Sequence, residues 1–260
     1  MDDGSTGIVT LAVPLGRASG GTGLSTIGSD GTILKAVSGA PAWSTCSPQA
    51  TTYTTGSGNF TIPAGVTNLK ITVIGAGGGG GGAGSNGAAM GGGAGGMAIK
   101  WLTGLTPGAT CAYAVGAAGS GGAAGNNAGS AGGNTTITVG ATTYTGAGGA
   151  GGTNQNDSSQ TGCSFSAGGT ATNGDLNITG DPGTPYYTGY VGSVTTLMGG
   201  QGGKTSYGAC MGVVQFSSPT TGKAGQNATG YGAGGGGAIT WTGSTFAGGN
   251  GAGGLIIIEY

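Results

Sequence analysis

The chain has 260 residues, of which 70 are glycine, and it carries six basic and seven acidic side chains. About a quarter of the residues of a typical globular domain are charged. Disordered chains combine high charge with low hydrophobicity. Neither class fits this nearly neutral, slightly hydrophobic sequence. A net charge of −1 with scattered basic residues gives no footprint for nucleic acid or for an anionic membrane surface.

Two further classes of segment are not expected. No charged region followed by an apolar run opens the chain, so we predict no secretory signal. The longest apolar run, residues 255–258, is far shorter than the roughly 20 residues needed to span a bilayer. We therefore expect no nucleic-acid partner and no membrane insertion.

The composition predicts an all-β fold. Each glycine costs about 1 kcal/mol relative to alanine in a helix. The polar residues are mainly Thr, Ser and Asn, which suit strands and turns.

Residues 1–50 contain short apolar couplets separated by glycine turns and end near Pro41-Ala42-Trp43. No segment here could bury a core by itself. We predict an extended attachment or oligomerisation segment that is stable when it winds around copies of itself, as in a homotrimer, or docks on a partner.

The clearest strands follow. Residues 69–74 alternate apolar and polar side chains, the period of a strand with one buried face. Residues 255–260 form the strongest strand and are expected to pair with residues 71–74, closing a β-sandwich frame. Further strands are expected at residues 59–62, 97–102, 110–115, 134–139 and 142–144, the last two joined as a hairpin by Gly140-Ala141.

Glycine runs lie between these strands, at residues 77–82, 91–96, 119–133, 146–152, 230–237 and 248–254. Glycine-rich sequence usually forms flexible linkers. If all six runs were linkers, however, folding would lose backbone entropy with no buried side chains to offset the loss. The alternative is extended polyglycine II, three residues per turn, in which neighbouring segments supply the hydrogen bonds. We favour such a bundle, inserted in the β frame of a glycine-rich domain over residues 51–260.

Four cysteines, Cys46, Cys111, Cys163 and Cys210, are widely spaced, with no C-x-x-C and no histidine in the chain. Buried thiols are the favoured interpretation, and a Cys163–Cys210 disulfide stays open.

The absence of histidine rules out Ser-His-Asp and Cys-His catalysis. The remaining option is a carboxylate pair among Asp157, Asp175 and Asp181, as in glycoside hydrolysis. Turn-forming neighbours favour a structural role for these aspartates. We therefore expect no enzymatic activity, catalytic residue, cofactor or metal, and calcium at these aspartates is the alternative.

Aromatic side chains are the best candidates for contact with a receptor, because Tyr and Trp give a large contact area at low entropy cost. They also stack on sugars. The alternative is that they form small cores that hold loops on the glycine-rich platform. The candidate residues are Tyr186, Tyr187, Tyr190, Tyr207, Phe216, Trp241 and Phe246.

Two stretches resemble bacteriophage proteins. Residues 16–44, from G-R-A-S-G-G-T-G-L to P-A-W-S, resemble a repeat of tail-fibre proteins. Residues 60–82, F-T-I-P-A-G-V-T-N-L-K-I-T-V-I-G-A-G-G-G-G-G-G, with the closing G-A-G-G-L-I-I-I-E-Y, resemble the glycine-rich domain of fibre tips.

The resemblance implies a structural protein of the virion, in the phage tail, as a trimeric tail-fibre or tail-tip component. Its tip would act as an adhesin on a bacterial surface receptor or glycan, with residues 153–216 as a variable insert. Residues 1–50 would attach to other tail proteins. A purely structural fibre or decoration protein, an ice-binding polyglycine bundle and a polysaccharide depolymerase are the alternatives.

Overall fold

A computed structural model describes residues 32–37, 40–45, 48–84, 87–155, 164–191, 194–210, 215–217, 222–241 and 243–260. The chain divides into two compact units, Met1–Gln49 and Ala50–Tyr260, each considered by itself. The described residues form strands, turns and extended segments, and none of their segments is a helix that could span a membrane. The all-β prediction is therefore confirmed.

The first unit contains an antiparallel hairpin of β1 (Thr32–Val37) and β2 (Ala40–Thr45). Leu34 of β1 lies opposite Trp43 of β2, so the apolar positions of this part of the sequence are paired across the hairpin. Residues 1–31, which carry most of the expected attachment segment, lie outside the described residues.

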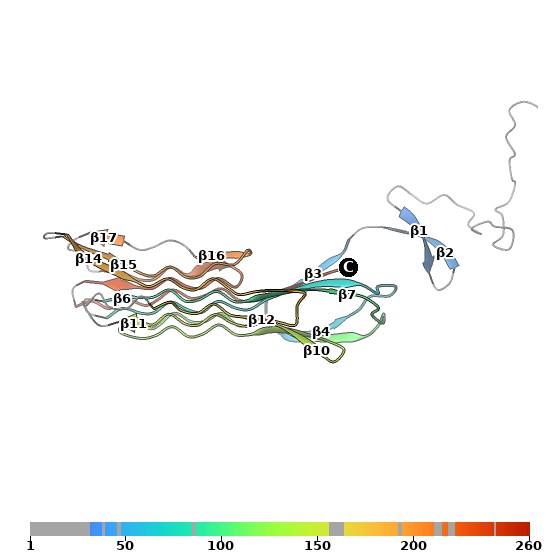
Figure 1. Ribbon diagram of the computed structural model, residues 1–260, viewed down its shortest axis with the longest axis horizontal. Coiled ribbons are helices and arrows are strands. Elements are labelled where there is room, and N and C mark those ends of the chain that lie inside the picture. Colours follow the sequence, from blue (N-terminus) through green and yellow to red (C-terminus); the bar gives the residue numbers. More distant parts are fainter. Residues whose placement is uncertain are drawn as a thin grey trace, which may run out of the picture. The chain divides into compact units, whose positions relative to one another are not determined.

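The second unit begins with a sandwich of two five-stranded antiparallel sheets at one end (Figure 1). One sheet has the order β13-β7-β5-β21-β3 and the other the order β12-β10-β9-β8-β4. The strands of the first are β3 (Ala50–Tyr53), β5 (Leu69–Ile74), β7 (Met97–Leu102), β13 (Leu176–Ile178) and β21 (Leu255–Glu259). Those of the second are β4 (Ser57–Thr61), β8 (Thr110–Ala114), β9 (Thr135–Val139), β10 (Thr142–Gly146) and β12 (Ala171–Thr172).

The hydrophobic core lies between these sheets and explains why β-branched residues dominate their inner faces. Ile71 and Val73 of β5 pack with Ile256 and Ile258 of β21, and all four side chains are fully buried. Ile137 of β9 contributes from the opposite sheet. Burial of each such side chain stabilises the fold by about 1.5–3 kcal/mol.

The expected pairings are present in the sandwich. β21 pairs with β5 along its whole length, with Ile258 opposite Ile71. β9 and β10 form the predicted hairpin, and Gly140 in its turn has φ of +60°, a conformation that favours glycine. The frame therefore follows from the alternation and the turn residues of the sequence.

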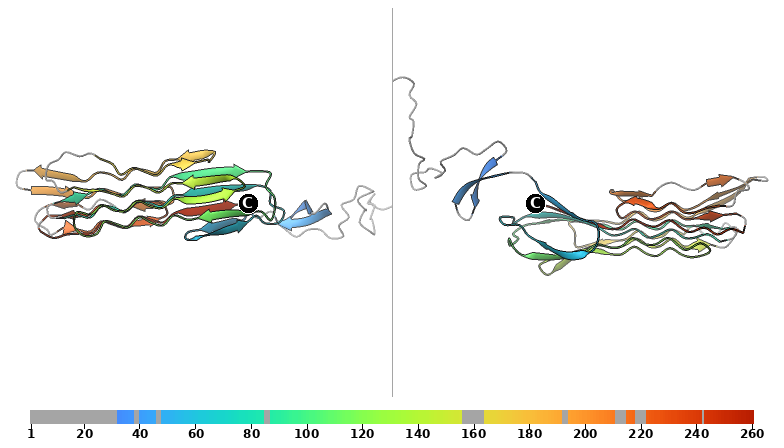
Figure 2. Two further views of the ribbon diagram at one scale, coloured as in Figure 1. Left: turned by 90° about the horizontal axis from the view of Figure 1, so that it is seen from below. Right: turned by 180° about the vertical axis from the view of Figure 1, so that it is seen from behind.

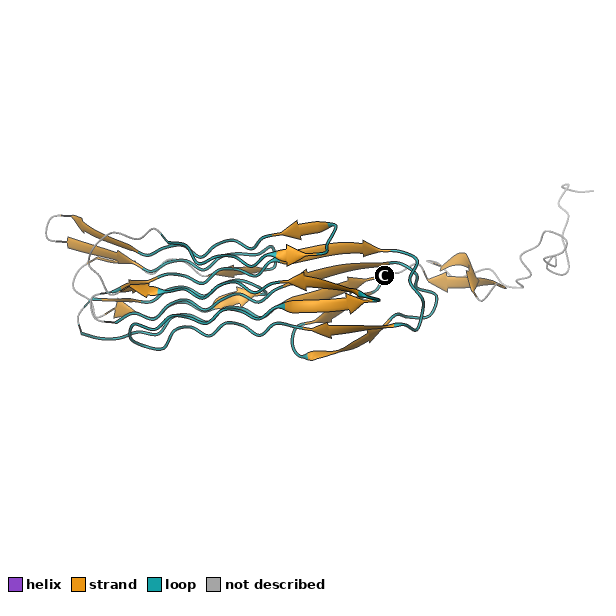
Figure 3. Cartoon of the chain, turned by 60° about the horizontal axis from the view of Figure 1, so that its bottom comes forward, coloured by secondary structure: helices purple, strands orange, loops and turns teal. Residues whose placement is uncertain are grey.

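The glycine runs extend from the strands as a bundle of wavy, parallel and antiparallel segments (Figure 2). They are drawn as loop in Figure 3 because their hydrogen bonds leave the segment instead of forming a helix or a sheet ladder. Segment 75–83 continues β5, segment 89–96 leads into β7, and segment 246–254 leads into β21.

A repeat of three residues governs these hydrogen bonds. Along segment 75–83, successive N–H groups donate in turn to segments 90–96, 127–133 and 246–252, and every third residue returns to the same neighbour. Carbonyl groups of the segment accept from three other neighbours, residues 119–122, 149–152 and 235–238. Six neighbours around one chain with three residues per turn define polyglycine II packing, so the prediction of a bundle is confirmed.

Close approach of backbones is what requires glycine here. A Cβ added to Gly77, Gly80 or Gly92 would lie closer than 3.0 Å to a backbone carbonyl oxygen of a neighbouring segment. None of these three glycines has a positive φ. The sequence therefore uses glycine in the bundle for space and not for conformational freedom.

Segments on the outside of the bundle bury only one position in three. In segment 146–153, Gly146, Gly149 and Gly152 are buried, and the residues between them are partly exposed or exposed. In segment 116–122 the buried glycines are again three apart, and alanine and serine occupy the exposed positions.

Side chains replace the missing neighbours at the surface of the bundle. Asn250 Oδ1 accepts a hydrogen bond from the N–H of Gly121 at 2.8 Å, and Asn134 Oδ1 accepts one from Gly148 at 3.0 Å. A backbone N–H without a partner is costly when water cannot reach it. The asparagine and serine residues of the outer segments thus complete the hydrogen-bond lattice.

Candidate functional site

The bundle ends, on the side away from the sandwich, in a group of short strands and turns that we call the loop end (Figure 1). A four-stranded sheet there joins β6 (Ala88–Ala89), β11 (Asn154–Gln155), β18 (Gly222–Lys223) and β20 (Ile239–Thr240). A three-stranded sheet joins β14 (Tyr187–Val191), β15 (Val194–Met198) and β17 (Gln215–Ser217). Closely packed glycine segments thus hold these elements at one place.

Two of the predicted contact residues help to hold the loop end together. Tyr186 and Trp241 pack, partly buried, against a small core of Ala88, Leu197 and Ile239. Their rings join β15 and β20, which are far apart in the sequence. For these two residues the structure supports the alternative of a small core that fastens loops to the platform.

Tyr187, the first residue of β14, is the clearest candidate for contact with a partner. Its side chain is 57% exposed, although it follows directly after the partly buried Tyr186. Phe165 is 58% exposed at the same end, next to Ser166, which bridges Gly183. Phe165 was not among the candidates, and its apolar side chain beside a glycine-rich segment was the signal available in the sequence.

Three further candidates also belong to the loop end. Tyr190 lies in β14 opposite Thr195, and Phe216 lies in β17 opposite Leu197. For both residues the structure describes the backbone and not the side chain. Phe246 is partly buried, forms a backbone bridge with Ala83, and lies where a Cβ on Gly222 would meet its ring.

Tyr207 is not brought together with the others. It lies in the turn before β16 (Gly208–Cys210), which pairs with β19 (Ala228–Gly230). This turn is near the sandwich side of the bundle, and Tyr207 is 43% exposed there.

The aspartates have separate surroundings. Asp175 forms an ion pair with Lys100 and accepts a hydrogen bond from the Trp101 N–H at 2.9 Å. Its hydrogen bond with the Lys100 ammonium, and then that with the Trp101 N–H, lower the pKa of the carboxyl. A carboxyl group with a lowered pKa is a poorer general acid at neutral pH. Asp157 lies outside the described residues.

No metal centre can be built from the part of the chain that the structure describes, because no three His, Cys, Asp or Glu side chains gather there.

Two cysteines lie in the described part. Cys111 is a free thiol in the sandwich core, and burial raises its pKa. Cys210 is also buried, and its Sγ accepts a hydrogen bond from the Gly202 N–H at 3.2 Å. Burial is the main cause that raises the pKa of Cys210. Cys46 and Cys163 lie outside the described residues.

Comparison with known proteins identifies the family of residues 51–260. No curated protein sequence matches the chain. The family model of the glycine-rich domain matches residues 51–260, the span that forms the sandwich and the bundle. The chain therefore belongs to the glycine-rich domain family.

Proposed function

We propose that this chain is a structural protein of a bacteriophage tail, a tail-fibre or tail-tip component that contacts the bacterial surface through the loop end. The observation that carries the proposal is the hydrogen-bonded glycine lattice, which ends in loops with exposed aromatic side chains. The two sequence resemblances at residues 16–44 and 60–82 supply the link to phage tails.

The lattice suits such a role because it fixes the loops before binding. Each backbone of segments 75–83 and 89–96 is bonded to neighbours on all sides. A platform that is already ordered avoids much of the entropy loss that binding otherwise requires. Tyr187 and Phe165 then offer large rings with few rotatable bonds at the loop end.

Residues 1–50 have the complementary role in this proposal. They connect the chain to other tail proteins and join three copies into a homotrimer. The β1–β2 hairpin supports this assignment, because an isolated two-stranded hairpin is at best marginally stable in water and gains stability from a partner surface.

The proposal is tested by binding to cells. Fluorescently labelled chain of residues 1–260 would be incubated with a panel of bacterial strains and measured by flow cytometry. We expect strain-selective binding that the double variant Phe165→Ser/Tyr187→Ser reduces at least tenfold. The matched control is Tyr207→Ser, because Tyr207 is an exposed tyrosine away from the loop end.

The same assay separates adhesion from a purely structural role. Binding to no strain, or binding that the double variant leaves unchanged, would contradict contact through the loop end and favour a fibre or decoration protein.

Ice binding is a second candidate function, favoured by one surface of the bundle. Ala117, Ser120 and Ala123 are exposed at intervals of three residues, and Ala128 and Ala131 repeat this pattern on segment 127–133. The repeat places small side chains about 9 Å apart along each segment. Thermal hysteresis of the purified chain would support this function, and freezing without hysteresis would exclude it.

A further inference from the structure

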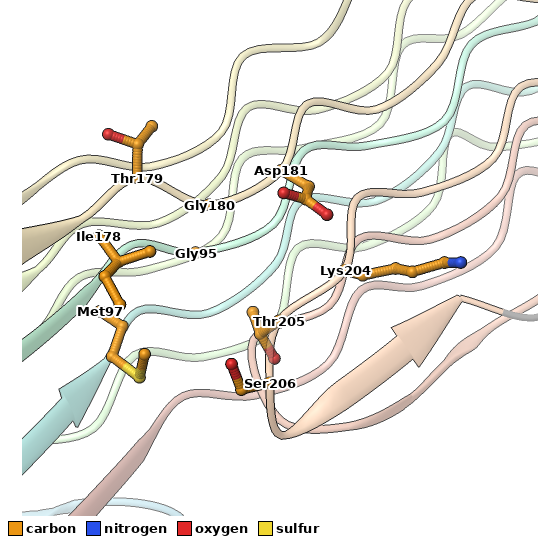
Figure 4. A pocket seen from close by; sticks show the side chains of 9 residues that line it. All are labelled: Gly95, Met97, Ile178, Thr179, Gly180, Asp181, Lys204, Thr205 and Ser206. Carbon is orange, nitrogen blue, oxygen red and sulfur yellow. The ribbon is translucent and has the colours of Figure 1, made fainter.

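A pocket of about 290 Å³ lies where the bundle meets the outer face of the sheet that contains β7 and β13 (Figure 4). Small-molecule sites are typically about 300–1,000 Å³, so this pocket suits a single small ring. Its lining consists of Gly95, Met97, Ile178, Thr179, Gly180, Asp181, Lys204, Thr205 and Ser206.

One side of the pocket is apolar. Met97 and Ile178 are direct partners in the register of β7 and β13, so their side chains lie on the same face of the sheet. Met97 is buried against Ile74 and Leu255, whereas Ile178 is 39% exposed. The two side chains form a hydrocarbon surface at the pocket.

The other side carries the Asp181 carboxylate. Asp181 and Lys204 lie on neighbouring segments of the bundle, since a Cβ on Gly203 would meet the Asp181 carbonyl. The Lys204 side chain points away from Met97 and Ile178, whereas the Asp181 carboxylate forms no hydrogen bond or ion pair with another described residue (Figure 4). The pocket thus offers one strong acceptor.

The hydroxyl groups of the turn differ in their availability. Thr205 Oγ1 donates to the Tyr231 carbonyl at 2.6 Å and accepts from the Tyr207 N–H at 3.2 Å, so it is already engaged. The Ser206 hydroxyl forms no hydrogen bond with another described residue. It is therefore available to a ligand beside the Asp181 carboxylate.

An apolar track continues from the pocket along β7 and β13. Ile99 lies opposite Leu176, next to the Met97–Ile178 pair, and Trp101 follows on the same face. Leu176 is 46% exposed and Trp101 is 54% exposed. At about 3.3 Å per residue, the track extends about 13 Å from Met97 to Trp101.

Exposed apolar side chains are concentrated here. The described residues expose six large hydrophobic side chains, and four of them, Trp101, Leu176, Ile178 and Tyr207, belong to the pocket, its track or the adjoining turn. A contiguous exposed apolar surface with a polar border is typical of a binding site.

We infer that this pocket binds one hexose ring of a neutral oligosaccharide, with the adjoining rings on the track. Sugar hydroxyls both donate and accept, so they can donate to the Asp181 carboxylate and bond to the Ser206 hydroxyl. The C–H face of the ring packs on Met97 and Ile178, and a later ring of the sugar chain stacks on Trp101. A purely apolar ligand would cover the Asp181 carboxylate without giving it a partner, which is unfavourable.

Charge also separates neutral from anionic ligands, because an anionic sugar in the pocket would face the Asp181 carboxylate. The inference adds a second contact site, far from the loop end, and does not depend on the proposed role in a phage tail.

The test is calorimetric titration of the full chain with purified maltotriose, cellotriose, mannotriose and galactotriose. We expect at least one of them to bind and to change the tryptophan fluorescence through Trp101. Asp181→Asn, which keeps the backbone carbonyl that accepts from Ala94 at 2.9 Å, should weaken binding at least tenfold. Lys204→Met should weaken it much less, because the Lys204 side chain points away from the pocket (Figure 4).

Glu259→Gln is the matched control, because Glu259 lies on the same sheet but pairs with Lys70 at 2.7 Å, away from the pocket. It should bind like the native chain, and thermal unfolding would establish that every variant is folded. Failure of all four trisaccharides to bind would overturn the inference. So would undiminished binding by a folded Asp181→Asn variant. Neither result affects the cell-binding test, which probes the loop end.

Discussion

Two glycines that look alike in the sequence can differ in whether the fold has room for an added methyl group. Gly251 and Gly253 are two residues apart in segment 246–254, but a Cβ on Gly251 would lie closer than 3.0 Å to the Gly77 carbonyl oxygen. A Cβ on Gly253 would meet nothing closer than 3.9 Å. The difference follows from which residue of each triplet faces the interior.

We predict that Gly251→Ala lowers the free energy of unfolding by about 1–3 kcal/mol or more, because backbone cannot move aside easily in a packed lattice. Gly253→Ala should instead stabilise by about 0.4–1 kcal/mol, because it restricts the unfolded chain. Thermal or chemical unfolding measures both variants. Equal effects of the two substitutions would contradict the packing argument.

Asparagine side chains at the bundle surface make a second prediction at this scale. Asn250→Ala removes the acceptor of the Gly121 N–H, and we expect a loss of about 0.5–1.5 kcal/mol. Asn250→Asp keeps an acceptor oxygen at the same position and should retain most of the stability. Urea unfolding of the three proteins tests this, and a destabilised Asp variant with an unaffected Ala variant would refute it.

At the scale of elements, one ion pair fastens the turn before β13 to β7. Lys100 and Asp175 form it, and the Trp101 N–H donates to the same carboxylate. The hydrogen bond to Asp175 raises the pKa of Lys100, while the same bond lowers the pKa of Asp175. The contribution of Asp175 to stability is therefore present above its unfolded pKa of about 3.9 and is lost as the pH falls through the lower folded value.

The contribution of Lys100 to stability depends on pH in the opposite direction. It is present below the ordinary lysine pKa of about 10.4 and is lost as the pH rises through the higher folded value. We predict that Lys100→Met raises the pKa of Asp175, measured by carbon NMR of the carboxyl group. Lys70→Met, which breaks the separate pair with Glu259, should leave that pKa unchanged. An unmoved Asp175 pKa in Lys100→Met would show that the ion pair is absent in solution.

The strands of the frame were predictable from sequence because their signal is local. Alternation in residues 69–74 and the β-branched run at 255–258 identify β5 and β21, and their similarity in length and composition identifies them as partners. The glycine runs predict a bundle through their number and length.

The arrangement of the bundle was not predictable in the same way. Nothing in the sequence G-G-G-G-G-G of residues 77–82 distinguishes one neighbour from another, and its six partner segments come from across the whole unit. Isolated glycine pairs such as Gly168-Gly169 and Gly202-Gly203 also belong to the lattice, although they carry no long run. The candidate aromatic residues were likewise chosen by type, and burial alone separates Tyr186 from Tyr187.

For the whole molecule, the test of greatest consequence is its oligomeric state. We predict that residues 1–260 form a trimer in size-exclusion chromatography with light scattering, because residues 1–50 cannot bury a core alone. Residues 50–260 form a compact unit with its own core and should be monomeric. A monomeric full chain would refute trimerisation through residues 1–50.

The triplet repeat of the bundle also constrains how such a chain can change in length. Inserting one residue in segment 75–83 would turn every later residue of that segment by about 120° and pair each N–H with the wrong neighbour. In an outer segment the same insertion would turn alanine or serine into the buried positions that glycine now occupies. Insertions and deletions within the bundle are therefore tolerated in multiples of three residues. The loops at its end have no such restriction, so they can vary in length and sequence while the scaffold stays in register.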